Sequence, residues 1–164
     1  MLLLAGALTL TLGACMSTTG TGKDDPLPVK DKSDAQAWAQ QMTEHMAEGA
    51  GIRIDPATVR PLFTPCTGRN GETARDDRYV LMYSVHSTVP LAQHPEAVRK
   101  VRDMLTKEGL TIKNYRETLG GRPDTILDAE HPSDYFLSVS STAGGEDRLL
   151  LRVITPCLLP PPAP

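Results

Sequence analysis

Residues 134–155 read DYFLSVSSTAGGEDRLLLRVIT and hold two runs of alternating apolar and polar side chains. A small turn that contains two glycines, at 143–146, separates the runs. Because successive side chains of a strand point to opposite faces, such alternation is typical of a sheet with one buried face. The stretch therefore predicts a β-hairpin with strands over 134–142 and 147–155.

Further β patterns lie upstream of this hairpin. Tyrosine and aliphatic residues alternate with other side chains over 79–86, which predicts a strand. Residues 110–118 predict a weaker strand, and the pair Ile126 and Leu127 predicts a short one. Together with the hairpin, these segments supply the strands of one sheet.

Two amphipathic helices are predicted as well. Ser33 followed by Gln36 forms a capping-box pattern, and apolar residues then recur at helical spacing until Gly51. Pro95 opens a second helical pattern, which ends at Gly109. The apolar residues of the two helical stripes are Ala35, Trp38, Met42, Met46, Ala97, Val98, Val101, Met104 and Leu105.

The order of these elements predicts a single α+β domain over 33–158. We expect a mostly antiparallel sheet of four to five strands, with two helices packed on one face. Asp55 followed by Pro56 predicts a short helical turn before Cys66. The proline-rich residues 159–164 are expected to trail as an extended tail.

Alternation also assigns side chains to the two faces of the expected sheet. The side chains expected to face the helices are Tyr79, Leu81, Tyr83, Val85, Leu137, Val139, Leu149, Leu151 and Val153. The opposite face is expected to carry Met82, Ser84, His86, Phe136, Ser138, Ser140, Leu150 and Arg152. Two interpretations of this mixed surface are open, namely a plain solvent-facing sheet and a platform that binds a partner.

Composition limits the classes of function. The chain has 164 residues, of which 40% are hydrophobic and 23% charged, as in an ordinary globular domain. Its 17 Lys and Arg against 20 Asp and Glu give a net charge of -3 and no broad basic field, so we expect no nucleic-acid partner. Aromatic residues make up 4%, which is few for a sugar-stacking cleft.

The N-terminal segment does not belong to the fold. Residues 1–14, MLLLAGALTLTLGA, carry no charge, and Cys15 follows directly. As a helix they would rise about 21 Å, which is short of the roughly 30 Å of a bilayer core. The segment is instead typical of a secretory signal peptide with a small-residue cleavage site.

Leu12, Gly13, Ala14 and Cys15 resemble the lipobox of bacterial lipoprotein signal peptides. In that family the cysteine thiol receives a diacylglyceryl group and a peptidase cuts before it. The resemblance implies that Cys15 becomes the lipidated N-terminus. No Lys or Arg precedes the apolar run, a departure that a start upstream of Met1 would explain.

Residues 15–32 are expected to form the lipidated end and a flexible tether, because they are rich in Ser, Thr, Gly, Pro and charge. The chain is also similar to small lipoproteins of high-GC Gram-positive bacteria in its lipobox, its tether and its Pro-Cys-Leu-Leu-Pro ending at 156–160. That resemblance implies no particular activity. It does imply an extracytoplasmic protein held on the cell membrane by a palmitate-bearing anchor at Cys15.

The remaining cysteines form a pair. Cys66 and Cys157 each end a Thr-Pro-Cys tripeptide, and export to an oxidising compartment would let them bridge. Closing a loop of this length is worth about 4 to 5 kcal/mol in the chain-entropy model. The alternatives are two free thiols, or a zinc site, for which no CxxC or HxxxH spacing is present.

No motif for catalysis stands out. The four histidines, His45, His86, His94 and His131, have no partner at a diagnostic spacing, and no G-x-S-x-G motif is present. Met42 with His45 and Met46 offers helical spacing for a Cu(I) site, although a core role explains the methionines better. We therefore expect no catalytic residue, no metal and no cofactor.

The sequence thus favours a non-enzymatic, membrane-anchored module that binds an envelope protein, a peptide or a cell-wall component. The alternative is an anchored hydrolase or metal-handling protein whose histidines and carboxylates are brought together by the fold. Convergence of His86 with a carboxylate in a cleft would favour this alternative.

Overall fold

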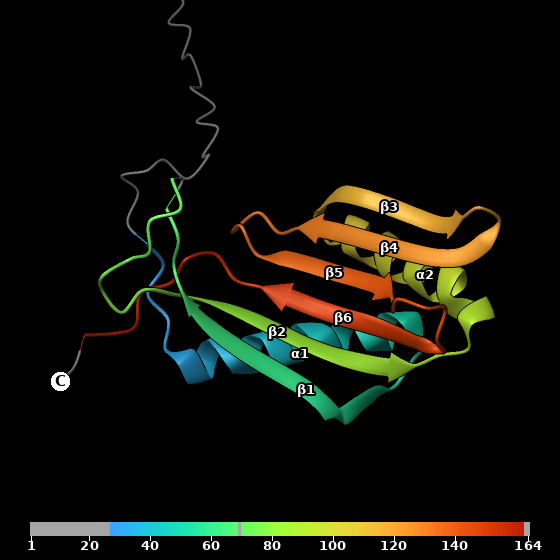
Figure 1. Cartoon of the computed structure of the whole chain (residues 1–164), viewed down its shortest axis with the longest axis horizontal. Coiled ribbons are helices and arrows are strands. Elements are labelled where there is room, and N and C mark those ends of the chain that lie inside the picture. Colours follow the sequence, from blue (N-terminus) through green and yellow to red (C-terminus); the bar gives the residue numbers. More distant parts are fainter. Residues whose placement is uncertain (1–26, 69, 163–164) are drawn as a thin grey trace, which may run out of the picture.

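A computed structural model of the chain describes residues 27–68 and 70–162. The predicted signal peptide (1–14), Cys15 and most of the predicted tether lie outside the described residues. The described part is an α+β fold with two helices on one face of an antiparallel sheet (Figure 1). Its elements are α1 (Lys32–Ala50), β1 (Ile54–Pro65), β2 (Tyr79–Thr88), a short 3-10 turn (Leu91–Gln93), α2 (His94–Lys107), β3 (Thr111–Leu119), β4 (Arg122–Glu130), β5 (Phe136–Ser141) and β6 (Arg148–Ile154).

The predicted hairpin forms the middle of the sheet. Within the described residues, six strands lie in the order β1-β2-β6-β5-β4-β3, and every neighbouring pair is antiparallel. Val139 of β5 is opposite Leu151 of β6, which is in turn opposite Val85 of β2. The fold class predicted from sequence is confirmed, with six strands rather than four to five.

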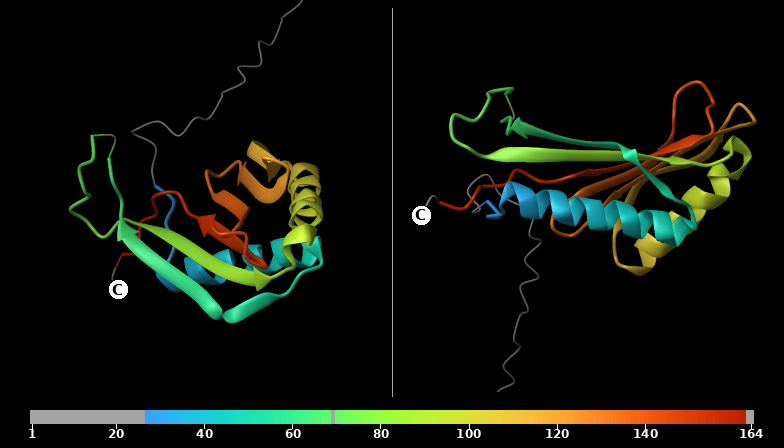
Figure 2. Two further views of the ribbon diagram at one scale, coloured as in Figure 1. Left: turned by 45° about the vertical axis from the view of Figure 1, so that its right-hand side comes forward. Right: turned by 90° about the horizontal axis from the view of Figure 1, so that it is seen from below.

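The helices cover one face of the sheet, as Figure 2 shows in the view from below. Helix α1 packs on β2 and β6, while α2 packs on β3 and β4. All nine side chains predicted to face the helices are at most 2% exposed. Burying such aliphatic side chains contributes about 1.5 to 3 kcal/mol each before entropy is counted, so this layer is the main source of stability.

One predicted element is wrong. Asp55 and Pro56 do not open a helical turn but lie in β1, the edge strand that raises the strand count to six. The Asp55 carboxylate accepts a hydrogen bond from Ala57 N at 3.0 Å, which forms a local turn inside the strand where the register with β2 shifts. An edge strand tolerates proline because one side of its backbone needs no partner.

The N-cap of α1 also differs from the one that the sequence pattern predicts. Asp31, not Ser33, caps the helix, because its carboxylate accepts from Ser33 N at 2.7 Å. Gly51 ends the helix with a φ of 72°, a conformation that favours glycine. No helix in the described residues is both long and apolar enough to cross a membrane.

The predicted disulfide is present. Cys66 and Cys157 are bridged, with their Cα atoms 5.8 Å apart, and the bridge ties the loop after β1 to the segment after β6. Beyond the bridge, Lys30 N donates to Leu159 O and Leu159 N donates to Pro28 O, both at 2.9 Å. Regular backbone pairing therefore extends beyond both ends of the predicted domain, 33–158.

Candidate binding surface

The sheet face opposite the helices carries all the side chains predicted for a binding face. Strand register aligns them in three rows that run across the strands. The first row is Leu62, Met82, Ile154 and Phe136. The central row is Arg60, Ser84, Arg152, Ser138 and Asp128. The third row is His86, Leu150, Ser140 and Ile126. We call these three rows the open face.

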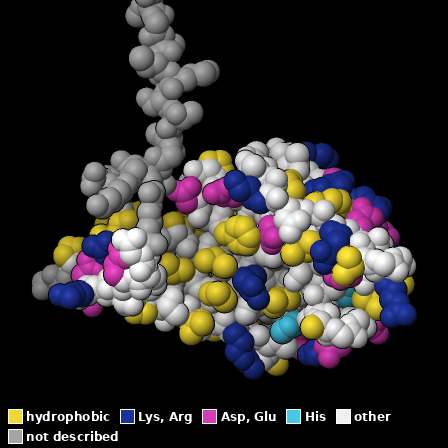
Figure 3. All heavy atoms as spheres, turned by 45° about the horizontal axis from the view of Figure 1, so that its top comes forward, with side chains coloured by type: hydrophobic (Ala, Val, Ile, Leu, Met, Phe, Trp, Pro, Cys, Tyr) yellow, Lys and Arg dark blue, Asp and Glu magenta, His cyan; other side chains and the backbone are white. Residues whose placement is uncertain are grey.

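The open face is a mixed surface rather than a second core. Its side chains from β2, β4, β5 and β6 are half-buried by one another, whereas Leu62 on β1 is 54% exposed. The space-filling view of this side of the molecule shows apolar, basic and acidic side chains interspersed (Figure 3). Ile154 continues the alternation of Arg152 and could have been predicted, whereas Leu62 required recognition of β1 as a strand.

Arg152 lies at the centre of the open face without a partner. Its Nε is shielded from solvent and has no hydrogen-bond partner, and its guanidinium forms no ion pair within residues 27–68 and 70–162. Ser84 on β2 and Ser138 on β5 lie directly opposite it on the two flanking strands. Buried polar atoms are normally paired, so an orphaned donor at this position needs an explanation.

Other charges near the open face are already committed. Lys113 pairs with Glu130 at 2.6 Å, and the amide of Asn114 donates to Asp128 at 3.3 Å. Arg60 directs Nη1 to two backbone carbonyl oxygens, and the nearer contact, to Val59 O, measures 2.7 Å. Glu130 is therefore neutralised by a cation and Asp128 is not, while the two arginines of the central row lack carboxylate partners among the described residues.

His86 has the second orphaned atom of the open face. Its Nδ1 is shielded from solvent and has no hydrogen-bond partner in the part of the chain that the structure describes. Glu146 is the carboxylate that interacts electrostatically with it: hydrogen bonding from Arg148 lowers the pKa of Glu146, and His86 makes a smaller contribution in the same direction. No hydrogen bond joins the two within the described part of the chain, so the acid–base pair that the hydrolase alternative requires is not formed.

His94, the first residue of α2, has a structural role. It is fully buried, and its Nε2 lies 2.9 Å from Val89 O. Because a carbonyl only accepts, Nε2 carries the proton, and Nδ1 accepts from Ser141 Oγ at 2.9 Å. Ser141 Oγ also accepts from Thr125 N at 3.1 Å and Thr125 Oγ1 at 3.0 Å. Both lone pairs of this hydroxyl are occupied, so it is not poised for nucleophilic attack.

The other histidines likewise have structural contacts. His45 on α1 pairs with Glu108 at the end of α2, at 2.7 Å, and His131 Nδ1 accepts from Ser133 N in the turn before β5. Met46 is fully buried in the core and Met42 packs partly buried against it, so the Cu(I) alternative with His45 loses one of its two sulfur ligands. No group of three or more His, Cys, Asp or Glu side chains with metal-site geometry occurs among the described residues.

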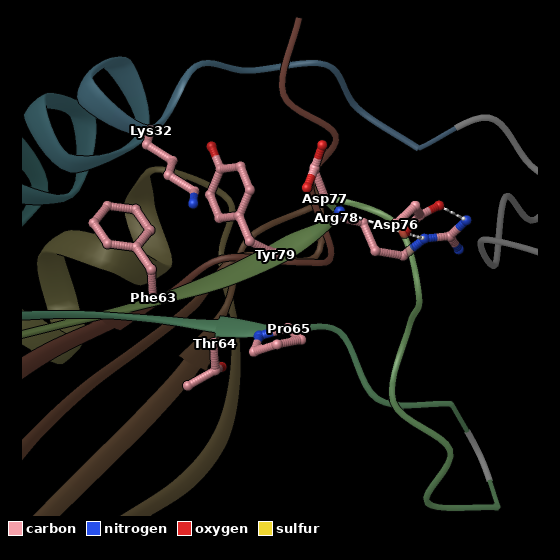
Figure 4. Close-up of a pocket in the computed structure, with 8 residues that line it drawn as sticks. All are labelled: Lys32, Phe63, Thr64, Pro65, Asp76, Asp77, Arg78 and Tyr79. Atoms are coloured by element: carbon pink, nitrogen blue, oxygen red, sulfur yellow. Dashed lines mark hydrogen bonds and ion pairs between the residues drawn. The ribbon is translucent and has the colours of Figure 1, made fainter.

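A hollow of about 190 Å³ lies at the disulfide end, between the start of α1 and the ends of β1 and β2 (Figure 4). Lys32 Nζ points between two rings and lies 5.7 Å from the centroid of Phe63 and 5.5 Å from that of Tyr79. Asp76 and Arg78 pair with each other at 2.5 Å. Lys32 joins the helix start to the sheet, and Asp76 and Arg78 are paired within the segment that leads into β2, so the hollow leaves few polar groups for a ligand.

Comparisons with protein-family models, with curated proteins and with solved structures find no match to this chain. The site must therefore be interpreted from its own chemistry. That chemistry consists of unpartnered polar atoms on a half-buried sheet face. The described residues hold no metal-site cluster, and no hydrogen bond joins His86 of that face to a carboxylate among them.

Proposed function

We propose that the chain is a lipid-anchored, extracytoplasmic protein whose domain is a non-enzymatic binding module. The open face is the surface that receives the partner. The observation that carries this proposal is Arg152 at the centre of a half-buried face, whose shielded Nε has no hydrogen-bond partner among the described residues. A sheet face meant only for solvent has no reason to shield a donor that it leaves unpaired.

The anchor is supported by the lipobox resemblance at Cys15 and by the cysteine pair. Cys66 and Cys157 are bridged, and bridges of this kind persist in oxidising compartments outside the cytoplasm. The segment from Cys15 to Val29 could extend at most about 50 Å, since extended chain spans about 3.3 to 3.6 Å per residue. The open face would therefore work close to the membrane surface.

The anchor is tested by metabolic labelling with palmitate. We expect label in the wild-type protein and none in Cys15→Ala, because the thiol is the acylated group. Cys157→Ser serves as the matched control, since it removes a different thiol and should leave labelling intact. Equal labelling of Cys15→Ala and wild type would contradict the anchor.

The binding role is tested by photo-crosslinking in living cells. A photoreactive residue at Phe136 lies on the open face, whereas one at Lys100 lies on the solvent side of α2, where the lysine is 52% exposed. We expect a discrete protein adduct from position 136 and none from position 100. Adducts of equal yield at both positions, or none at either, would count against the open face as a binding surface.

A further inference from the structure

We infer that the open face binds an extended protein segment with the pattern apolar-x-acidic-x-apolar, whose carboxylate pairs with Arg152. This inference rests on the proposed binding function and names the chemistry of its partner. It goes beyond that function because it assigns one residue as the charge-reading centre and fixes the spacing of the groups around it.

Charge is the first argument. Arg152 and Arg60 flank Ser84 in the central row, and neither has a carboxylate partner among the described residues. Lys113 pairs with Glu130 on the same face, whereas Asp128 of the central row accepts only from the neutral amide of Asn114 and keeps its charge. With two arginines and one aspartate, the central row has a net positive charge, which complements an acidic side chain. A charge-assisted pair in this shielded setting is stronger than one in open water.

Hydrogen-bonding capacity is the second argument. The hydroxyls of Ser84 and Ser138, on the two sides of Arg152, form no hydrogen bond within the described ranges, and neither does that of Ser140. Hydroxyls can donate to a carboxylate oxygen that the guanidinium does not satisfy. Arg152 with its two flanking serines therefore forms a set of convergent donors suited to one carboxylate.

Spacing is the third argument. The first and third rows place apolar side chains on both sides of the charged row, chiefly Met82 and Ile154 on one side and Leu150 on the other. Neighbouring rows are two residues apart along each strand, which corresponds to about 6.6 Å. An extended segment presents side chains on one side at the same interval. A peptide lying along the strand direction would therefore place an acidic residue over Arg152 and an apolar residue over each flanking row.

Two other occupants fit less well. A second copy docked face to face over the centre would bring Arg152 against its own equivalent, which opposes association. An anionic membrane surface attracts clusters of basic residues, whereas the central row carries Asp128 beside its two arginines. Both occupants are outcomes that the test below can reveal.

The test uses the full chain purified in detergent and three fluorescein-labelled peptides. Their cores read Leu-Thr-Glu-Thr-Leu, Leu-Thr-Gln-Thr-Leu and Leu-Thr-Lys-Thr-Leu, and binding is followed by fluorescence anisotropy. We expect the Glu peptide to bind at least about tenfold more tightly than the Gln peptide, and the Lys peptide to bind most weakly. Equal affinity for the three peptides would overturn the inference.

Substitutions test whether Arg152 is the residue that recognises the peptide carboxylate. Arg152→Gln should abolish the preference for Glu over Gln, while Arg75→Gln, at an exposed arginine of the loop between β1 and β2, should keep it. Arg152→Glu should reverse the preference in favour of the Lys peptide, and loss of structure cannot produce such a reversal. A preference that survives in Arg152→Gln, or that is lost equally in Arg75→Gln, would overturn the inference.

Two further outcomes separate the occupants. Arg152-dependent flotation with phosphatidylglycerol vesicles, without peptide binding, would overturn the inference in favour of a membrane surface. A concentration-dependent dimer that Arg152→Gln strengthens would overturn it in favour of a second copy. If photo-crosslinking at position 136 succeeds while the peptides show no Glu preference, this inference fails and the proposed binding function stands. If crosslinking fails too, both fall.

Discussion

The two faces of this sheet use their polar groups in opposite ways. On the helix-covered face, buried His94 and the adjoining Ser141 form a closed hydrogen-bond network. On the open face, Arg152 and His86 keep shielded donors or acceptors without partners among the described residues. The same strands supply both faces, residue by residue. The polar groups of the helix-covered face therefore stabilise the fold, whereas those of the open face remain available to a partner.

The largest expected difference between the two faces comes from replacing two neighbouring leucines of β6 with alanine. Leu151 is fully buried under the helices, while Leu150 is half-buried on the open face. We expect Leu151→Ala to lower the free energy of unfolding by about 3 to 5 kcal/mol, because it leaves a cavity in the core. Leu150→Ala should cost less than about 1 kcal/mol, as at surface positions.

Urea unfolding of the oxidised protein measures both changes. Because the two substitutions remove the same atoms from adjacent residues, each serves as the control for the other. Losses of equal size would show that the open face is covered by structure of the chain itself, which would contradict its assignment as a free surface.

A pair of histidine substitutions makes the next largest contrast. His94→Ala should cost about 2 to 4 kcal/mol, because it leaves the hydroxyl of Ser141 and the carbonyl of Val89 without their imidazole partner and opens a cavity. His86→Ala should leave stability within about 0.5 kcal/mol of wild type, since its Nδ1 makes no bond to lose.

Thermal unfolding at neutral pH distinguishes these cases. A large loss from His86→Ala would mean that the ring is engaged in the free protein, and the open face would then have fewer uncommitted groups than we infer. A negligible loss from His94→Ala would contradict the structural role of the buried network.

The central part of the fold could be predicted because its signal is local. In 79–86 and 134–155 the period-two alternation survives in consecutive residues, so the inward side chains could be named from sequence. Strand β1 could not be predicted from sequence, because Pro56 and Pro61 indicate a helix start or a turn unless the segment is known to be a sheet edge. Only the tertiary arrangement supplies that information.

The candidate site shows the same division. Alternation predicted that Arg152 and His86 face away from the helices. It could not predict that Arg152 lacks an ion pair among the described residues, because that depends on the strand order and register that place Ser84 and Ser138 opposite it. The hydrogen bonds of His94 could not be predicted for a similar reason, since its partner Ser141 lies 47 residues away.

The smallest expected change in stability concerns Glu117 of β3, which pairs with Arg99 of α2. Hydrogen bonds from Arg99, and next from the Tyr115 hydroxyl, lower the pKa of Glu117 from 4.5 to about 2. The carboxylate titrates at its usual pKa in the unfolded chain, so its stabilising contribution is complete above about pH 4.5 and is lost as the pH falls towards 2. The side chain is 28% exposed, and solvent weakens the contribution.

Glu117→Gln should therefore lower the Tm by about 1 to 3 °C at pH 7, and the difference from wild type should shrink as the pH falls from 4.5 to 2.5. Glu48→Gln, at an exposed carboxylate of α1 with no partner among the described residues, should leave the Tm unchanged at both pH values. A Glu117→Gln difference that stays constant down to pH 2.5 would show that the glutamine disturbs packing rather than charge. The Arg99–Glu117 ion pair would then not stabilise the fold, and it could no longer be contrasted with Arg152 as a charge that contributes to stability.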